Sequence, residues 1–433
     1  LRQDIFCIEP TPLAEYFPPM NCVATNGNLL DRDRLYRYCT QIYVSDALND
    51  SFSTGDRMIK AVIWWVSVVF LCVLPVYAVN TNEIEALRQR VLQSGTELSA
   101  ADTAVISRFW SAALDQMLLS ANTQDMVEVR RQLEAQKGNE YLSYYATAYI
   151  AEAAKDIQAA FQNSQRIENP QQRTNAERNL MILTANLASP KLAPIAIGRI
   201  GDPDEVIRYW AVKAITQPAV IEQLTKQEVT RDPQTAEAIL NALKERILNE
   251  PLTEIQKMMI DFAAAFNHPA ARQILLSLAE QRLKAYRQWT VQDELAEAKL
   301  LTALGTIAML HQDADVKKTF GKAFAELYAA VFQRYMKGAD RLSAEQTEQL
   351  AAVIAEIDQT VVNKTMGIQT TVVRTLQRRG PLDSDYEMLF GNRQLAGELG
   401  LRFKFDYGKD ASGKPITFPA ELDPMPEAAK SPE

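Results

Sequence analysis

The chain has 433 residues, of which 47% are hydrophobic and 8% aromatic, and its formal net charge is -8 at pH 7. This length suits two or three ordinary domains or one extended array of helices. The Ala, Leu, Gln and Glu that dominate after residue 80 argue against all-β and α/β folds. A mildly acidic, evenly mixed charge gives no electrostatic reason to expect a nucleic-acid partner.

Residues 1–57 differ in composition from the rest of the chain and show no sustained strand or helix periodicity. We expect them to be either upstream sequence translated from a mis-annotated gene start or a disordered tail. No function is inferred from this stretch.

Residues 58–78 contain the parts of a secretory signal peptide in the correct order. A short basic region with Lys60 precedes an uncharged apolar core, and Pro75 then breaks the helix ahead of the small residue Ala78. The sequence therefore predicts an exported chain, periplasmic or secreted, that begins at Val79 and has no stable membrane insertion after cleavage.

The rival interpretation is a single N-terminal membrane anchor over residues 61–79, a run about long enough to span a bilayer. However, no basic stop-transfer cluster follows this run, and the polar residues after it resemble a cleavage region. The signal peptide is the favoured interpretation, and the anchor is kept as its alternative.

All cysteines precede the predicted cleavage site: Cys7, Cys22, Cys39 and Cys72. The mature chain would therefore have none, which excludes disulfides, thiolate nucleophiles and cysteine-ligated metals from it. The lack of thiols also suits an oxidising compartment.

Residues 79–400 show one amphipathic helical pattern after another, separated by short breaks. Ser99 begins a Ser-x-x-Asp start signal, and the apolar stripe behind it predicts a helix with one buried face. Prolines at the breaks, such as Pro170 and Pro269, suit the first turn of a helix. Similar stripes predict helices over 124–137, 140–162, 172–187, 219–229, 233–249, 252–266, 269–288, 291–311, 314–336 and 343–363.

Residues 401–433 are expected to form an extended, mostly disordered C-terminal tail. Leu401–Tyr407 alternates weakly and predicts a short strand or an extended segment. From Lys409 onward Gly, Pro, Ser and charged residues predominate, a composition typical of disorder.

The clearest repeat unit lies at residues 191–215, KLAPIAIGRIGDPDEVIRYWAVKAI. Asp202 suits the cap of a helix that Pro203 opens, with Glu205 at the capping-box position. The apolar residues behind this start form a single core stripe: Ile207, Trp210, Ala211, Ala214 and Ile215.

This unit resembles a HEAT repeat of the bacterial type, also called PBS-lyase HEAT-like. The resemblance implies that Asp202 and Arg208 join a hydrogen-bonding ladder between repeats, a role in architecture rather than catalysis. Weaker echoes begin at residues 232, 267 and 313, and their uneven spacing predicts an all-α, irregular α-solenoid of HEAT-like, armadillo-type repeats. The positions that match are Pro194, Gly201, Asp202, Pro203, Asp204, Ile207, Arg208, Ala211 and Ala214.

Few residues suited to catalysis or metal binding follow the predicted cleavage site. His268 and His311 are expected at helix ends, as a cap and as a partner of the helix dipole. No Gly-rich phosphate loop is found, and the carboxylate pairs Glu294–Glu297 and Glu345–Glu348 are interpreted as solvated helix surface. We therefore predict no catalytic residues, no cofactor and no metal site.

Four tyrosines, Tyr141, Tyr144, Tyr145 and Tyr149, recur at helical spacing. The functional interpretation is a partner surface, an aromatic platform for a glycan or a peptide. The structural interpretation, which we favour, is a seam between helices with the hydroxyls at its edge.

The sequence is compatible with two candidate functions. The first is a non-enzymatic scaffold of the cell envelope, whose stacked helix pairs bind a protein or peptide partner. The second is an all-α envelope enzyme, a polysaccharide hydrolase or lyase that works with carboxylates. The enzyme would require a deep acidic pocket with two carboxylates, and the missing catalytic constellations favour the scaffold.

Overall fold

A computed structural model describes residues 81–138, 143–225, 233–291, 293–338 and 341–424. All of them belong to one compact unit, Tyr77–Glu433. The described residues are helical apart from loops and two isolated β-bridges, so the all-α prediction is confirmed. The expectations for residues 1–57, for the signal peptide 58–78 and for residues 425–433 lie outside the described part of the chain.

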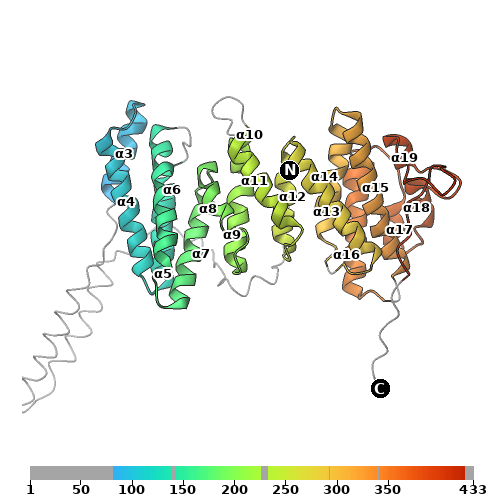
Figure 1. Cartoon of the computed structure of the whole chain (residues 1–433), viewed down its shortest axis with the longest axis horizontal. Helices are drawn as coiled ribbons and strands as arrows, with labels where there is room; N and C mark the ends of the chain where they lie inside the picture. The colour runs from blue at the N-terminus through green and yellow to red at the C-terminus, as the bar shows by residue number, and fades with distance from the viewer. Residues whose placement is uncertain (1–80, 139–142, 226–232, 292, 339–340, 425–433) are drawn as a thin grey trace, which may run out of the picture. The chain divides into compact units, whose positions relative to one another are not determined.

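The first half of the unit contains the longer helices of the N-terminal region and the predicted repeat (Figure 1). These are α3 Thr81–Ser94, α4 Ala100–Leu119, α5 Thr123–Gln136, α6 Tyr144–Ser164, α7 Pro170–Asn186, the 3-10 turn η2 Pro190–Leu192, α8 Ala193–Ile197, α9 Glu205–Thr216 and α10 Pro218–Thr225.

The second half continues in the same manner and ends in short helices. Its elements are α11 Pro233–Ile247, α12 Thr253–Ala265, α13 Pro269–Arg287, α14 Ala296–Leu310, α15 Ala314–Lys337, α16 Ala344–Ile357, the π-helical turn η3 Asp358–Asn363, α17 Val372–Gln377, α18 Asp383–Phe390 and α19 Glu398–Phe403.

Helix starts follow the local sequence signals. Ser99 and Asp102 form a reciprocal capping box at α4, which confirms the start signal read there. Ser343 and Gln346 do the same at α16. At α7 the side chain of Asn169 accepts hydrogen bonds from two backbone N–H groups ahead of a first-turn proline, which satisfies donors that the helix itself cannot pair.

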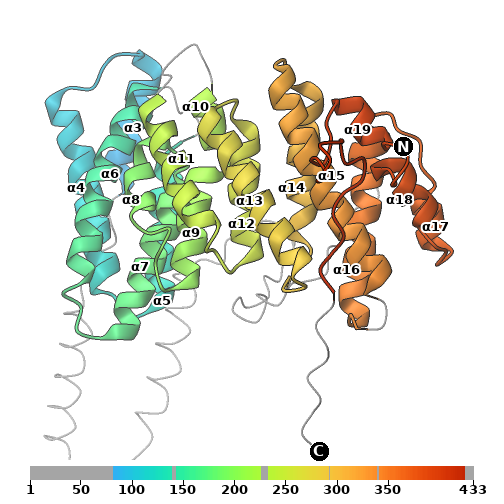
Figure 2. The ribbon, with the colours of Figure 1, turned by 45° about the vertical axis from the view of Figure 1, so that its right-hand side comes forward.

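The helices pack in two rows, as Figures 1 and 2 show. In one row α5, α7, α9, α12, α14 and α16 contact one another in that order. In the other row the order is α4, α6, η2 with α8, α11, α13 and α15. Helices that follow each other in the chain, such as α4 and α5 or α14 and α15, connect the rows. Each helix therefore buries one face against its row neighbours and another against the opposite row.

The core between the rows is made of Leu, Ile, Val, Ala and aromatic side chains from every one of the longer helices. Two glycines allow close approaches within it. A Cβ at Gly305 of α14 would collide with Val361 of η3, and a Cβ at Gly321 of α15 would collide with Phe403 of α19. Gly321 is thus what lets the last helix lie directly on α15.

The C-terminal region differs from the expected tail. Residues 401–403 complete α19, which ends at Lys404 with a left-handed φ of 54°, so the strand predicted over Leu401–Tyr407 is wrong. Phe403, Phe405 and Leu422 are buried, and the extended tail predicted from residue 401 is therefore packed up to residue 424. A helix of six residues is too short to show a helical period in the sequence.

Among the described residues, no helix combines the length and the apolar character that crossing a membrane requires. The run 61–79, on which the signal-peptide and anchor interpretations depend, lies outside those residues.

Candidate functional site

The predicted repeat unit occupies α8, α9 and the loop between them. Ile207, Ala211 and Ala214 are buried on one face of α9, as the core stripe requires. Pro194 lies at the start of α8 and is exposed. Trp210 departs from the expected stripe because it remains half-buried at the surface.

The start of α9 is two residues later than the sequence indicated. Asp204, not Asp202, is the N-cap, and its carboxylate accepts the backbone N–H groups of Val206 and Ile207 at 2.9 and 3.1 Å. Asp202 accepts the N–H of Asp204 at 3.0 Å, which forms a turn that ends before the helix. Pro203 consequently lies in the loop and is exposed.

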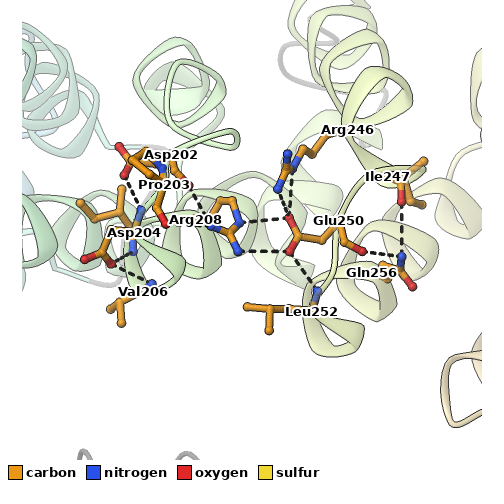
Figure 3. Close-up of polar contacts among 11 residues, drawn as sticks. Asp202, Pro203, Asp204, Val206, Arg208, Arg246, Ile247, Glu250, Leu252 and Gln256 are labelled. Carbon is orange, nitrogen blue, oxygen red and sulfur yellow. Dashed lines mark hydrogen bonds and ion pairs between the residues drawn. The ribbon is translucent and has the colours of Figure 1, made fainter. Parts of the chain in front are cut away.

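Arg208 is the centre of a buried polar network (Figure 3). Its Nη1 donates to the carbonyls of Asp202 and Pro203 at 2.8 and 3.3 Å. Its Nε donates to the carboxylate of Glu250 at 3.2 Å, and Arg246 of α11 donates to the same oxygen at 3.0 Å. Arg208 therefore ties α9 to the loop that precedes α12, a partner 42 residues further along the chain.

Glu250 also organises the loop in which it lies. Its Oε1 accepts the N–H of Leu252 at 3.1 Å, and its carbonyl accepts the side-chain amide of Gln256 at 2.7 Å. Figure 3 shows these bonds joining the end of α11 to the start of α12 around the buried carboxylate. The sequence resemblance indicated the Arg208 side of this link but gave no signal for Glu250.

Comparable polar links join the earlier helices of the same row, α5, α7 and α9. Arg130 of α5 donates to Asn179 of α7 at 3.0 Å. Arg178, the residue of α7 directly before Asn179, forms a two-armed ion pair with Asp204 ahead of α9, its shortest bond being 2.7 Å. These bonds lower the pKa of the Asp204 carboxyl, although its partial burial opposes the shift.

Glu294 and Glu297 are both 0% exposed, so their interpretation as solvated surface is wrong. Glu297 pairs with Arg282 of α13, and Glu294 pairs with Arg334 of α15 at 3.0 Å. Burial raises the pKa of Glu297 to about 7, against the opposing effect of Arg282. Burial raises the pKa of Glu294 as well. By contrast, Glu345 and Glu348 are exposed, as predicted.

Two carboxylates beside a tyrosine are residue types found in acid–base catalytic sites, but here a substrate in solvent could not reach them. Tyr286 lies beside the pair, and its hydroxyl and one oxygen of each carboxylate have no hydrogen-bond partner among the described residues. Both glutamates nevertheless face arginines from neighbouring helices and are closed off from solvent. The arrangement binds α13, the start of α14 and α15 together.

The tyrosines of α6 form part of the core rather than a platform. Tyr145 and Tyr149 are 1% and 0% exposed and stack with ring centroids 5.6 Å apart. The Tyr149 hydroxyl donates to the carbonyl of Leu133 at 2.7 Å. Tyr144 is 48% exposed, and Tyr141 lies outside the described residues. The prediction of a partner surface is therefore wrong for Tyr145 and Tyr149, because both are buried.

An aromatic patch occurs instead on α9, where the sequence did not indicate one. Tyr209 and Trp210 are half-buried and meet edge to face at 5.5 Å, and the ammonium of Lys213 lies 4.3 Å from the centre of the Trp210 ring. We name these three residues the α9 patch. The helical period placed Trp210 in the core stripe, and the structure turns it to the stripe's edge.

A hollow of about 240 Å³ lies where α10, α11 and the start of α13 meet. Its walls are mainly apolar, and Glu237 and His268 are the ionisable residues among those that line it. His268 caps α13 by accepting the N–H of Ala270 at 3.2 Å, in line with the expectation for this residue. The described residues contain no group of three His, Cys, Asp or Glu placed to hold a metal ion.

Comparison with protein-family models and with curated protein sequences finds no match for this chain.

Proposed function

We propose that the protein is an exported, non-enzymatic scaffold of HEAT-like helical repeats that binds a protein partner in the cell envelope. The observation that carries the proposal is the repeated polar link along one row: Arg130 with Asn179, Arg178 with Asp204, and Arg208 with Glu250. Polar links between successive helices of one row fit a stack in which each unit contacts only its neighbours, and stacks of this kind serve as binding surfaces.

The buried carboxylates also support a role in binding rather than catalysis. Glu250, Glu294 and Glu297 are all paired with arginines inside the helix array. A substrate would need access to a carboxylate of this kind, and their side chains are 0% exposed. These groups are thus used for packing helices together.

The α9 patch is the proposed site of partner contact. Tyr and Trp side chains are common at the centres of protein interfaces, because they combine a large apolar area with a polar tip. Tyr209 and Trp210 are half-buried and expose part of their rings, while buried residues such as Ile207 and Ala211 fix α9 in the core. The proposal therefore places the partner over α9.

Photo-crosslinking tests this function. A benzophenone amino acid replaces Tyr209 in the full-length chain, expressed in the cells that make it, and the envelope fraction is irradiated. We expect one light-dependent species of higher mass, and its loss when Trp210→Ala is added. The same probe at Leu119, which is 82% exposed at the end of α4, is the matched control and should give no such species.

Two results of the crosslinking experiment would count against the proposal. The scaffold proposal is contradicted if position 209 gives no light-dependent species, or if positions 209 and 119 give the same products.

One observation favours the second candidate, an envelope polysaccharide hydrolase or lyase: the raised pKa of Glu297 beside Glu294 and Tyr286. Perturbed carboxyls of this kind concentrate at catalytic sites. Purified full-length chain is incubated with envelope polysaccharide, and new reducing or unsaturated ends are counted. Release by the wild-type chain that Glu297→Gln abolishes would establish the enzyme in place of the scaffold.

A further inference from the structure

The segment after α19 packs against α13 and α15, and we name residues 419–424 the C-terminal strap. The surface that binds the strap is formed by Arg287, Trp289, Gln333 and Lys337, and we call it the groove. Pro419 and Leu422 are buried, whereas Ala420, Glu421, Asp423 and Pro424 are exposed. In Figure 2 the deep red chain beyond α19 runs beside α15. The strap belongs to no helix or strand, so its position depends on what the groove offers it.

Gln333 of α15 binds the strap through main-chain atoms. Its side-chain N–H donates to the carbonyl of Ala420 at 3.2 Å, and its side-chain oxygen accepts the N–H of Leu422 at 2.8 Å. The same amide nitrogen donates to the hydroxyl of Tyr386 at 2.6 Å, which fixes the orientation of the amide. One buried glutamine thus pairs with both a donor and an acceptor of an extended peptide.

The end of α13 binds the next main-chain groups. The N–H of Asp423 donates to the carbonyl of Arg287 at 3.1 Å, and the indole N–H of Trp289 donates to the carbonyl of Asp423 at 2.9 Å. Trp289 has a φ of 60°, a left-handed conformation that is uncommon for a residue other than glycine. Its ring lies 5.6 Å from the guanidinium of Arg334, which holds the indole in place.

Two side chains of the strap make the contacts that depend on its amino-acid sequence. The Leu422 side chain is buried, and the carboxylate of Glu421 pairs with Lys337 of α15 at 2.9 Å. Lys337 and the more distant Arg393 lower the pKa of Glu421, so the positive charge around this end of the groove favours an acidic residue there. The groove is therefore matched to an extended peptide in which an acidic residue precedes a leucine.

We propose that the groove between α13 and α15 is a docking site for extended partner peptides of acidic-Leu type, and that the C-terminal strap occupies it in the absence of the partner. Main-chain recognition by Gln333, Arg287 and Trp289 is independent of the strap's identity, as in other complexes that bind extended peptides. The strap is an internal competitor that lowers the apparent affinity of an external peptide. This inference rests on the proposed binding function and names its partner class.

Peptide exchange tests the proposal. The probe is a fluorescent octapeptide with the sequence of residues 417–424, TFPAELDP. In the full-length chain, Leu422→Asp places a charge at the buried position 422. This should release the strap from the groove, and no residue of a helix is substituted. We expect the octapeptide to bind this variant about tenfold more tightly than it binds the wild-type chain, whose groove is filled.

Two matched controls define the site. The octapeptide that itself carries Leu422→Asp should bind the released variant about tenfold more weakly than the unchanged octapeptide. Adding Gln333→Ala to the released variant should weaken binding to a similar extent. The groove is excluded as a peptide site if the two octapeptides bind equally, or if Gln333→Ala has no effect, in a variant whose circular dichroism shows unchanged helix.

A measurement on the wild-type chain covers the case in which Leu422→Asp does not fold. Excess octapeptide should speed hydrogen–deuterium exchange at the amides of Leu422 and Asp423, because the external peptide displaces the strap. Unchanged exchange at saturating peptide would overturn the proposal. Failure here beside successful crosslinking at Tyr209 would exclude the groove but leave the scaffold function. The opposite pattern would contradict the scaffold proposal at the α9 patch and leave the groove as a peptide site.

Discussion

Arg208 shows how a single residue can join two helices that lie far apart in the sequence. Its guanidinium bonds to two carbonyls in the loop ahead of α9 and to Glu250 in the loop ahead of α12, and both charged side chains are nearly or fully removed from solvent. Ion pairs at such positions contribute little net stability compared with apolar packing. Losing one partner is costly, however, because the other charge remains buried.

Arg208→Ala should therefore destabilise the chain by about 3 kcal/mol, measured by urea denaturation. Arg246→Ala is the matched control, since Arg246 pairs with the same Glu250 carboxylate but is 24% exposed. We expect it to cost about 1 kcal/mol, because solvent screens the more exposed pair. Equal losses for the two variants would contradict the central role of Arg208.

Glu297 should make the stability of the fold depend on pH. Its pKa is about 7 in the folded chain and 4.5 ordinarily, so the folded state holds the proton more tightly than the unfolded state does. This stabilising contribution is complete below about pH 4.5 and is lost as pH rises towards 7.

Glu297→Gln removes the titration. From pH 4.5 to 7 the wild-type chain should therefore lose up to about 3 kcal/mol of unfolding free energy relative to this variant. Urea denaturation at several pH values measures the difference. Glu345→Gln, at an exposed glutamate, is the control and should track the wild-type chain. Parallel curves of unfolding free energy against pH for the wild-type chain and Glu297→Gln would show that burial does not raise the pKa of Glu297.

At the scale of elements, helix positions followed from the sequence with good accuracy. Stripes such as those predicted over 124–137 and 314–336 correspond to α5 and α15 within two residues. Apolar periodicity and caps are local signals, which is why they suffice. The short helices α17 to α19 gave no comparable signal, because a helix of six or eight residues has fewer than three turns.

The candidate site was less predictable than the helices. Periodicity placed Glu294 and Glu297 on a polar face, but their burial depends on Arg282 and Arg334, which lie on other helices. Glu250 likewise meets Arg208 across 42 residues. Contacts between distant segments leave no periodic signal, so a single sequence does not reveal which charges will be buried together.

The corrected start of α9 gives a prediction at this scale. Asp204 caps the helix and also pairs with Arg178 of α7, whereas the carboxylate of Asp202 bonds only within its own turn and to Arg199. Asp204→Ala should therefore lower the unfolding free energy by about 2 kcal/mol, and Asp202→Ala by clearly less. Thermal denaturation of the two variants compares them. A larger effect at Asp202 would restore the helix start that the sequence indicated.

For the whole molecule, the two-row packing has a consequence for cooperativity. If the helices form a stack in which each unit contacts only its neighbours, a destabilising substitution should lower stability only in the helices close to it. In Arg208→Ala, hydrogen–deuterium exchange should rise in α9 and α12 and remain unchanged in α4, several units away. A uniform rise over the whole helical unit would indicate one cooperative core instead of a stack.

We propose that the helical unit is exported and begins at Val79, after residues 58–78 are removed as a signal peptide. Mass spectrometry of the N-terminal peptide, combined with fractionation of the cells that make the protein, tests this most directly. We expect Val79 to be the first residue, in the soluble envelope fraction. An uncleaved chain that starts at Met58 and sediments with membranes would contradict it and establish the anchor over 61–79.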